Sequence, residues 1–359
     1  GGDEFMFCQQ QVDDIDDIIH LLGQIKQCFD QPFEVQGQSH SITATMGIAV
    51  YPQSGLDADT LLRNADIALY RAKEQGRNTY QFYTEGMQER EVMRLELDKD
   101  LSQALANNEF VLFYQPQLNL DTGEIQSVEA LIRWRHPRRG LLPPVEFIPL
   151  AEESGRITDI GRWVVLAACR QLAAWRGTPQ ENLRIAVNLS GRELDDEDLV
   201  DHIREALAAE NVPADRLEVE LTEEIFIQNI EHNLNQLSRL HQLGVHLAID
   251  DFGVGYSSLG YLRDFPVDLL KIDRSFITEV TERHDDAVIT RAVINLAHNL
   301  GIEVVAEGVE TEEQLNFLKS YRCNFAQGYL ISRPIPVSDL EKALASGVLV
   351  ADITADSGL

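Results

Sequence analysis

The sequence predicts an α/β protein: a modified TIM (β/α)8 barrel with an antiparallel first strand, preceded by a partial α+β domain. Beyond residue 106, eight short strand-like runs alternate with longer helical stretches. The runs are nearly continuous in apolar residues, as expected for parallel strands buried on both faces. Eight such units over about 250 residues favour a closed barrel over an open sheet. The first two runs are joined only by Asp121–Gly123, too short for a helix, so we expect these two strands to be antiparallel.

The domain boundaries follow from this rhythm. We expect a first domain at residues 1–84, a connecting helix at 85–106 and the barrel at 107–350. Within the barrel, helical stretches such as DDAVITRAVINLAHNLG separate most of the strands. The expected strands are, in order, FVLFYQP, QSVEALIRW, LRIAVNLS, RLEVELTE, HLAIDDFG, LLKIDRSF, IEVVAEGVE and FAQGYLIS.

The first domain has its own local signals. Residues 41–51 alternate and are rich in β-branched side chains, which predicts a strand. Residues 61–76 have apolar side chains at helical spacing and end at a glycine, which predicts a helix with a C-terminal stop. Residues 78–83 predict a closing strand. In the connecting segment, apolar residues recur every fourth position from Met93 to Leu105, which predicts one helix.

The charge of the chain limits its partners. The 359 residues carry a formal net charge of -29, and 44% of them are hydrophobic. This acidity argues against general nucleic-acid binding, which depends on basic patches. A ligand that carries phosphate would therefore need local cations or metal ions to attract it. No apolar run approaches the roughly 18 residues of a membrane span, so this fragment predicts no membrane segment.

The cysteines predict neither a disulfide framework nor a zinc site. Cys8, Cys28, Cys169 and Cys323 are scattered and form no CxxC pair, a pattern typical of buried single thiols in a reducing compartment. No signal peptide is visible, and the first residue is not methionine. We therefore expect a cytoplasmic fragment, or the cytoplasmic part of a larger sensor protein.

Polar residues gather at the ends of the expected strands. In a (β/α)8 barrel these ends converge on one rim, where the active sites of this fold lie. Residues spread over two hundred positions would therefore meet in one cleft. They are Gln115, Glu129, Asn188, Glu220, Asp250, Asp251, Lys271, Asp273, Glu307 and Gln327, with Arg133, Glu223 and Glu310 close behind three of them.

Such a concentration of carboxylates predicts a site for divalent cations. Asp250 and Asp251 are adjacent at the end of an apolar run, and like charges near a core are costly unless a cation holds them. Oxygen ligands suit Mg²⁺, Mn²⁺ and Ca²⁺. Two ions about 3.5–4 Å apart are a common device for phosphoester hydrolysis. Gly253 and Gly255 would let the loop turn sharply beside the ions.

Each feature alone has a simpler interpretation. A carboxylate at a strand end is commonly a helix cap or a rim salt bridge, and Asn188 could be only a turn residue. Lys271 could be a salt-bridge partner of Asp250 or Glu307. Trp134 and Phe147 are most simply packing residues. The joint pattern over consecutive strands is what favours a functional site.

The motifs resemble a known family. Glu129-Ala130-Leu131 with Arg133-Trp134 resembles the signature of the EAL-domain cyclic di-GMP phosphodiesterases. The resemblance continues in the family's order through EFIPLAEESG, NLS, ELTE, DDFGVGYSSL, LKID, VAEGVE and QGYLISRP, over residues 95–344. The opening GGDEF with NADIALYRAKEQGRN resembles the second half of a diguanylate cyclase domain, over residues 1–83. The chain is thus identified as a member of the GGDEF–EAL tandem proteins.

The resemblance implies hydrolysis of cyclic di-GMP to linear pGpG with two Mg²⁺ or Mn²⁺ ions, in bacterial second-messenger signalling. Lys271 would contact the attacking water, and Glu307 would receive its proton. Glu223 and Glu310 would support the DDFG loop, in which Val254 replaces the family's usual Thr. One ion would be held by Glu129, Asn188, Glu220 and Asp250. The second ion would be held by Asp250, Asp251 and Glu307, with Asp273 nearby. The substrate would be contacted by Gln115, Leu131 and Arg133, and its pocket would be lined by Asn188, Asp251 and Gln327.

For the first domain, the resemblance implies a degenerate cyclase half. The chain begins at the expected hairpin tip, where Asp3 or Glu4 would hold a metal ion, and the other parts of a cyclase site precede that tip. GTP would bind only to an intact GGDEF domain in a longer protein, and the EAL domain would form a homodimer. The tip residues are Gly1, Gly2, Asp3, Glu4 and Phe5.

Two other functions remain open at this point. A catalytically silent receptor would bind cyclic di-GMP and signal by a change of shape, although such a receptor could lose metal ligands that this chain retains. An unrelated metal-dependent barrel hydrolase would prefer a different phosphodiester. The charged helix at 89–105 could be a linker or could transmit a signal.

Overall fold

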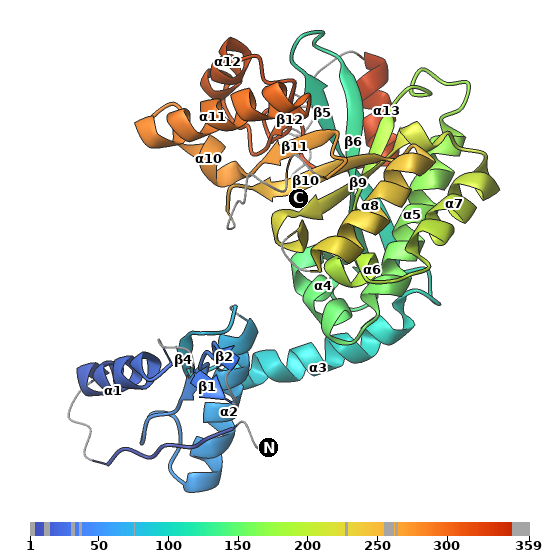
Figure 1. Ribbon diagram of the computed structural model, residues 1–359. Helices are drawn as coiled ribbons and strands as arrows, with labels where there is room; N and C mark the ends of the chain where they lie inside the picture. Colours follow the sequence, from blue (N-terminus) through green and yellow to red (C-terminus); the bar gives the residue numbers. More distant parts are fainter. Residues whose placement is uncertain are drawn as a thin grey trace. The chain divides into compact units, whose positions relative to one another are not determined.

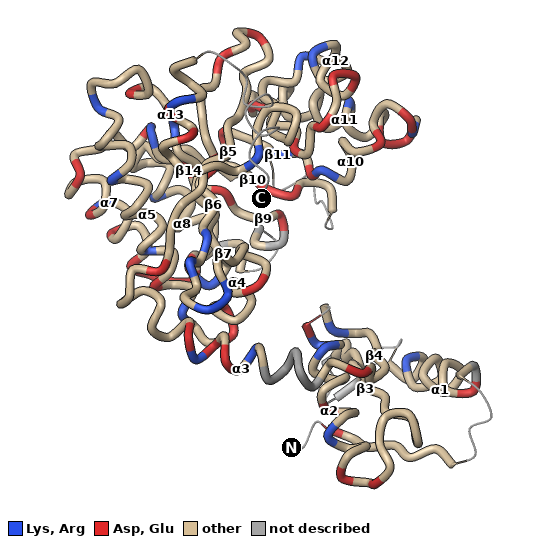
Figure 2. Tube along the Cα trace, turned by 180° about the vertical axis from the view of Figure 1, so that it is seen from behind, with Lys and Arg blue, Asp and Glu red and all other residues tan. Residues whose placement is uncertain are grey.

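The structure is a computed structural model that describes residues 4–10, 15–29, 33–35, 38–74, 76–226, 229–254, 262 and 265–346. The chain divides into two compact units, Gly1–Lys99 and Asp100–Leu359, each described separately below (Figure 1). Asp and Glu, drawn red in Figure 2, occur on helices and loops of both units, with Lys and Arg among them. Within the described ranges, no helix combines the length and apolarity needed to cross a membrane.

The first unit is a small α+β piece. Met46–Ile48 (β3) and Tyr80–Phe82 (β4) pair in parallel, so the strand expected over 41–51 is shorter than predicted. Helix α2 (Ala58–Glu74) begins where the Asp57 side chain accepts a hydrogen bond from the Thr60 amide at 2.8 Å. The unit's other elements are α1 (Ile15–Gln27), β1 (Phe33–Val35) and β2 (Gln38–His40), and β1 pairs antiparallel with β2.

Helix α2 packs directly on strand β3. A Cβ atom on Gly47 would lie 2.2 Å from the Leu69 amide nitrogen, so only glycine allows this approach. The expected connecting helix is α3, Met87–Ala104. Its last turn belongs to the second unit, where Asp100 Oδ2 lies 3.0 Å from Nε2 of the buried His136.

The second unit is a closed barrel of eight strands, as the sequence predicts (Figure 1). Strand β5 pairs antiparallel with both β6 and β13, and the pairs from β6 through β13 are parallel. The antiparallel first strand is thereby confirmed. In barrel order, the strands are β5 (Phe110–Asn119), β6 (Ile125–His136), β8 (Arg184–Asn188), β9 (Leu217–Thr222), β10 (His246–Phe252), β11 (Leu269–Ile272), β12 (Glu303–Ala306) and β13 (Phe325–Ala326).

Helices surround the barrel, and two short strands extend its sheet. Strand β7 (Gly140–Leu142) pairs with β6, and β14 (Ile335–Pro336) pairs with β5. The helices are α4 (Pro144–Glu153), α5 (Ile157–Ala174), α6 (Gly191–Leu194), α7 (Leu199–Glu210), α8 (Ile230–Leu243), α10 (Arg274–Thr278), α11 (His284–Leu300), α12 (Glu312–Ser320) and α13 (Val337–Ser346), with 3₁₀ turns η1 (Ala214–Arg216) and η2 (Glu223–Phe226).

The barrel interior is layered. Ala248, Leu269, Val305 and Phe325 from four neighbouring strands form one buried apolar cluster. Because side chains on a strand alternate between faces, the residue two positions later on each strand also faces the interior. Those residues are Asp250, Lys271, Glu307 and Gln327. An apolar layer is therefore the floor of a polar site at the carboxyl ends of the strands.

The packing residues and cysteines can now be placed. Trp134 and Phe147 are fully buried, and their rings lie 5.7 Å apart, as expected for core residues. Cys169 and Cys323 are buried single thiols, as predicted. Cys8 and Cys28 are exposed, so the expectation that all four thiols are buried was wrong. Both lie in the small first unit.

Gly328, directly after β13, allows two segments of the rim to meet. A Cβ atom there would lie 2.1 Å from the Val309 carbonyl oxygen and 2.2 Å from its amide nitrogen. The Val309 amide donates to the Gln327 carbonyl at 3.0 Å, which fixes the end of β13 beside the segment after β12. The two site residues Gln327 and Glu307 are thereby brought together.

We expect Gly328→Ala to lower the free energy of unfolding by about 1–3 kcal/mol, because the methyl group meets backbone atoms that cannot yield without moving both segments. Urea unfolding of the whole chain measures this. Gly191→Ala is the control, since a Cβ atom at that position has its nearest neighbour at 3.6 Å. Equal midpoints for the two variants would contradict the expected clash.

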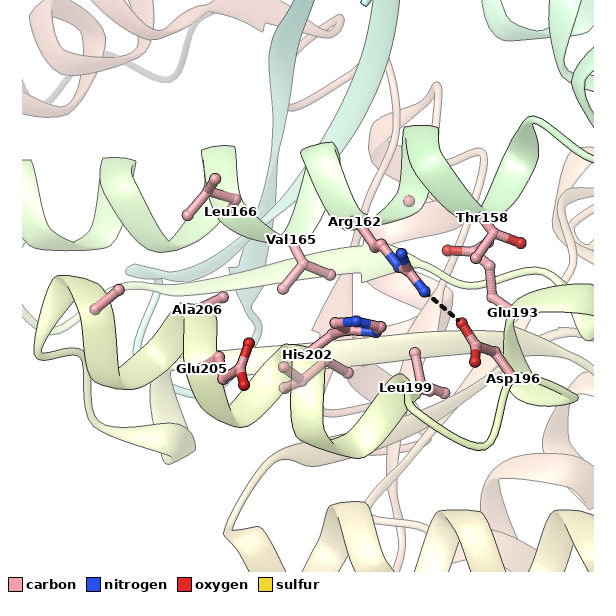
Figure 3. Close-up of a pocket in the computed structure, with 13 residues that line it drawn as sticks. Thr158, Arg162, Val165, Leu166, Glu193, Asp196, Leu199, His202, Glu205 and Ala206 are labelled. Atoms are coloured by element: carbon pink, nitrogen blue, oxygen red, sulfur yellow. Dashed lines mark hydrogen bonds and ion pairs between the residues drawn. The ribbon is translucent and has the colours of Figure 1, made fainter.

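A cavity of about 260 Å³ lies outside the barrel, between helices α5 and α7 (Figure 3). Arg162 and Asp196 form an ion pair of 2.9 Å at one end of it. Glu193 also lines it and is only 4% exposed; its Oε2 accepts hydrogen bonds from the Ser190 amide at 3.0 Å and hydroxyl at 2.6 Å. Burial raises the pKa of Glu193 to about 7, although the Ser190 hydrogen bonds oppose the shift.

The raised pKa of Glu193 should make the stability of the fold depend on pH. Its folded-state pKa of about 7 lies above the ordinary 4.5, so its stabilising contribution is full below pH 4.5 and is lost as the pH rises through 7. The free energy of unfolding should therefore fall by about 3 kcal/mol between these pH values. We expect Glu193→Gln to remove most of this loss, because the amide resembles the protonated acid.

Urea unfolding at about pH 5 and about pH 8 measures the difference. The exposed Glu205 lines the same cavity, and Glu205→Gln should keep the wild-type dependence. The expectation fails if Glu193→Gln and the wild type lose the same stability between the two pH values.

Candidate active site

Lys271 is the centre of the polar layer. It is fully buried, and its Nζ lies 2.7 Å from Glu220 Oε2, 2.8 Å from Glu307 Oε1 and 3.1 Å from Asp250 Oδ1. Glu129 Oε2 lies farther away, at 3.7 Å. One ammonium group therefore faces four carboxylates from strands β6, β9 and β10 and the end of β12. The sequence suggested Asp250 or Glu307 as its partner, and the structure brings it to both.

Amide side chains hold Glu129. Its Oε1 accepts a hydrogen bond from Asn188 Nδ2 at 2.8 Å, and its Oε2 accepts one from Gln327 Nε2 at 2.5 Å. Gln327 Nε2 also donates to Gln115 Oε1 at 3.1 Å. Gln115 lies directly opposite Glu129 in the antiparallel β5–β6 pair and not at a strand end, because β5 continues to Asn119.

Asp250, Asp251 and Glu307 form the group best suited to a metal ion. Each offers a carboxylate oxygen, and the three oxygens lie within 4.8 Å of one another, which no other group of three His, Cys, Asp or Glu does in the part of the chain that the structure describes. Asp251 has a φ of +53°, and its amide donates to Asp250 Oδ1 at 2.9 Å. This left-handed backbone lets two adjacent carboxylates face one site.

The donor set fits a divalent cation. Glu220 is fully buried, yet its Oε1 has no hydrogen-bond partner among the described residues. A buried carboxylate oxygen without a partner is costly unless a cation binds it. All oxygens of the set are hard ligands, of the kind that Mg²⁺ and Mn²⁺ prefer.

The electrostatics show how the acidic layer coexists with one lysine. Burial alone would lower the pKa of Lys271, but the surrounding carboxylates hold its pKa well above the ordinary value, so it stays charged. Burial holds the pKa of Glu220 well above its ordinary value and raises the pKa of Glu307 to about 8, although Lys271 opposes both shifts. Burial and the neighbouring Asp250 raise the pKa of Asp251 to about 6.

Glu129 behaves differently from its neighbours. Burial raises its pKa, but Lys271 and the hydrogen bonds from Gln327 and Asn188 outweigh burial and hold the pKa below the ordinary value. Glu129 therefore stays ionised with the help of neutral donors. Its amide neighbours keep it as an acceptor facing the interior.

The loop after β10 is hydrogen-bonded to a residue that follows β9. Glu223 Oε2 accepts a hydrogen bond from the Gly253 amide at 3.0 Å, which ties the residues after β9 to the start of this loop. Gly253 has a φ of +103°, and a Cβ atom there would lie 2.8 Å from the Phe276 ring. Val254 is 66% exposed, so its side chain points to solvent.

The remaining expected residues have other surroundings. Asp273 caps α10, its Oδ1 accepting from the Ser275 amide at 3.0 Å, and its charge helps to raise the pKa of Asp251. Glu310 has an exposed side chain, and its amide donates to Gln314 Oε1 at 2.7 Å. Of the cyclase tip, Glu4 Oε1 lies 3.7 Å from Lys73 Nζ and Phe5 is exposed. Gly1, Gly2, Asp3 and Gly255 lie outside the described residues.

Four of the expected substrate residues lie on β5, on β6 and directly after β13, which are neighbouring strands of the barrel. Leu131 and Arg133 follow Glu129 on β6 at alternate positions and are half-buried. The Arg133 guanidinium lies 5.6 Å from the centre of the Phe113 ring, and its Nη1 donates to the Ile132 carbonyl at 2.9 Å. Gln115 and Gln327 are buried in the layer beside Glu129.

Sequence reasoning missed one buried amide and one buried hydroxyl group behind Gln327, those of Gln117 and Ser127. Gln117 Nε2 donates to Gln327 Oε1 at 3.0 Å, and Ser127 Oγ donates to Gln117 Oε1 at 2.5 Å. The signal was present: Gln117 is two residues after Gln115, and Ser127 is two before Glu129, so each faces the same side of its strand.

Comparison with known families assigns the two units. The EAL domain model matches residues 98–334, and the model "Diguanylate cyclase, GGDEF domain" matches residues 1–79. The chain belongs to the EAL-domain family. A partial GGDEF region precedes its EAL barrel, in agreement with the resemblance seen in the motifs.

Relatives of this EAL protein cover nearly the whole chain. Cyclic di-GMP phosphodiesterase NbdA of Pseudomonas aeruginosa is 43% identical over 344 residues, which are 96% of this chain and 44% of NbdA. Bifunctional diguanylate cyclase/cyclic di-GMP phosphodiesterase MucR of the same species is 41% identical over 345 residues, 96% of this chain and 50% of MucR. The chain thus spans about half the length of these curated relatives.

A solved structure shares the EAL barrel. The structure "PaMucR Phosphodiesterase, c-di-GMP complex" is 44% identical, with a TM-score of 0.66, and the match covers 68% of this chain and 99% of that chain. The match agrees with the modified barrel described above.

Proposed function

We propose that this EAL barrel hydrolyses one phosphodiester bond of cyclic di-GMP and releases linear pGpG, using two Mg²⁺ or Mn²⁺ ions. The observation that carries the proposal is the group of Asp250, Asp251 and Glu307 oxygens within 4.8 Å, beside the ring of carboxylates around Lys271. The relatives NbdA and MucR are both named as cyclic di-GMP phosphodiesterases, which supports the choice of substrate.

The residues that would hold the ions are divided between two positions. Asp250 lies in both sets. It faces Lys271 together with Glu129 and Glu220, and it also belongs to the group with Asp251 and Glu307. Glu220 Oε1 supports the first position, because it is buried and has no hydrogen-bond partner within the described part of the chain. We assign Glu129, Asn188, Glu220 and Asp250 to the first ion, and Asp250, Asp251 and Glu307, with Asp273 nearby, to the second.

The ions, when bound, would neutralise phosphate oxygens and make a water molecule more acidic. Lys271 would supply a positive charge beside the attacking water; in the metal-free chain the surrounding carboxylates hold its pKa well above the ordinary value. Glu307, with Oε1 2.8 Å from Lys271 Nζ, would take the proton from that water. Arg133 would add a positive charge for the substrate phosphates, and Leu131, Gln115 and Gln327 would complete its pocket.

The chain's other expected properties are part of this proposal. We place domain boundaries at residues 84 and 106; the family matches end at residue 79 and begin again at residue 98, so the EAL match includes the last residues of the connecting helix. We propose a cytoplasmic EAL domain that forms homodimers. GTP would bind only where the GGDEF domain is complete.

Turnover of cyclic di-GMP with Mg²⁺ or Mn²⁺, followed as release of pGpG, tests the proposal. Glu129→Gln should abolish most turnover, because an amide replaces a charged ligand of similar shape. Tight binding of cyclic di-GMP by the wild type without turnover would favour the silent receptor instead. A stronger preference for another phosphodiester would favour a different barrel hydrolase.

A further inference from the structure

A chain of buried hydrogen bonds extends from Glu129 into the barrel, away from the expected substrate side. Gln327 Nε2 donates to Glu129 Oε2 at 2.5 Å, and Gln117 Nε2 donates to Gln327 Oε1 at 3.0 Å. Ser127 Oγ donates to Gln117 Oε1 at 2.5 Å. Gln117 is 1% exposed and Ser127 is 5% exposed, so water does not compete for these groups.

The acceptors at the ends of this network fix the direction of every donor. A carboxylate oxygen only accepts, so Gln327 must turn its NH₂ group toward Glu129. Its second N–H donates to Gln115 Oε1, and Gln115 is itself fixed because its NH₂ donates to the Ser332 carbonyl at 3.0 Å. The Gln327 carbonyl oxygen then faces the interior and needs a donor.

Gln117 supplies that donor. Without it, Gln327 Oε1 would be a buried acceptor with nothing to accept from, and turning the amide over would satisfy it only by placing oxygen against Glu129. Ser127 supports the same orientation, because its hydroxyl group donates to the oxygen of Gln117. The two residues therefore act on Glu129 through Gln327.

We propose that Gln117 and Ser127 are positioning residues of this site: they hold the Gln327 amide with its NH₂ group toward Glu129 and so keep that carboxylate oriented to bind a metal ion. The inference rests on the proposed function, because it takes Glu129 as a metal ligand. Residues that orient a metal ligand typically contribute a factor of about 10–100 to metal affinity.

Calorimetric titration of the whole chain with Mn²⁺ tests this inference without requiring turnover. We expect Gln117→Leu to weaken Mn²⁺ binding by about tenfold. If Gln117 acts through Gln327, the double variant Gln117→Leu/Gln327→Leu should bind Mn²⁺ as weakly as Gln327→Leu alone, because the second change then removes nothing more. If Gln117 acts independently of Gln327, the fold-losses in Mn²⁺ affinity of the two single variants should instead multiply in the double variant.

Ser127→Ala is a milder variant that keeps the barrel filled. It should weaken Mn²⁺ binding by a smaller factor, and it should have no effect in the Gln327→Leu background. Gln236→Leu is the matched control: Gln236 is 3% exposed and donates to the Asp196 carbonyl at 3.0 Å, outside the barrel. It should lower stability and leave Mn²⁺ affinity unchanged.

The outcomes separate the inference from the proposed function. Wild-type affinity in Gln117→Leu, or losses that multiply in the double variant, would overturn the positioning role and leave the proposed function standing. A wild-type chain that hydrolyses cyclic di-GMP with Mg²⁺ but does not bind Mn²⁺ at the Glu129 position would overturn the positioning role as well. Failure of both Mn²⁺ binding and turnover would overturn the two together.

Discussion

Lys271→Met is expected to lower the free energy of unfolding of the metal-free chain by about 3–5 kcal/mol, the cost of leaving a buried charge without its partner. Lys271 is fully buried, and three carboxylates lie within 3.1 Å of its Nζ. Methionine fills similar space and supplies no charge. Thermal and urea unfolding with and without Mn²⁺ measure the effect, and Mn²⁺ should restore part of the loss because it also neutralises the carboxylates.

Protons can neutralise the same carboxylates, so Lys271→Met should lower the free energy of unfolding less at about pH 5 than at about pH 8. Turnover of cyclic di-GMP should fall by about 10²-fold, because a fixed positive charge leaves the reaction centre. Lys342→Met is the control: this side chain is 74% exposed, and its pair with Asp339 is worth about 0–1 kcal/mol. Equal stability of the two variants would show that Lys271 does not hold the acidic layer together.

Glu307→Gln is expected to reduce turnover by about 10²–10⁴-fold, because the amide cannot accept the proton of the attacking water. The variant keeps the shape of the side chain, so cyclic di-GMP should still bind. Steady-state turnover and equilibrium binding of the same preparations measure the two effects separately. The fall should appear in kcat, with a small change in affinity for the substrate.

Glu303→Gln is the matched control for that experiment. Glu303 begins the strand β12 that Glu307 follows, and its exposed side chain lies at the opposite end of the strand. It should turn over cyclic di-GMP like the wild type. Near-normal kcat in Glu307→Gln would remove Glu307 from the role of proton acceptor and direct attention to the other carboxylates around Lys271.

Local patterns were enough to predict the order of the elements. All eight barrel strands overlap the runs FVLFYQP to FAQGYLIS, and the connecting helix was predicted within two residues at each end. The less accurate predictions were in the first unit, where the strand expected over 41–51 is only Met46–Ile48. An alternating pattern shows which residues could face a partner, but the length of a strand depends on the length of the strand beside it, here Tyr80–Phe82.

The sequence by itself determined the barrel, its antiparallel start and the polar residues at the strand ends, because strand periodicity and the length of a connection are local properties. Only the tertiary structure decided that Lys271 lies among carboxylates from β6, β9, β10 and the end of β12, and that Gln117 and Ser127 are hydrogen-bonded in series to Gln327. Those contacts depend on the stagger between strands and on side-chain direction in a closed barrel. Gln117 and Gln327 are 210 positions apart, so no local pattern joins them.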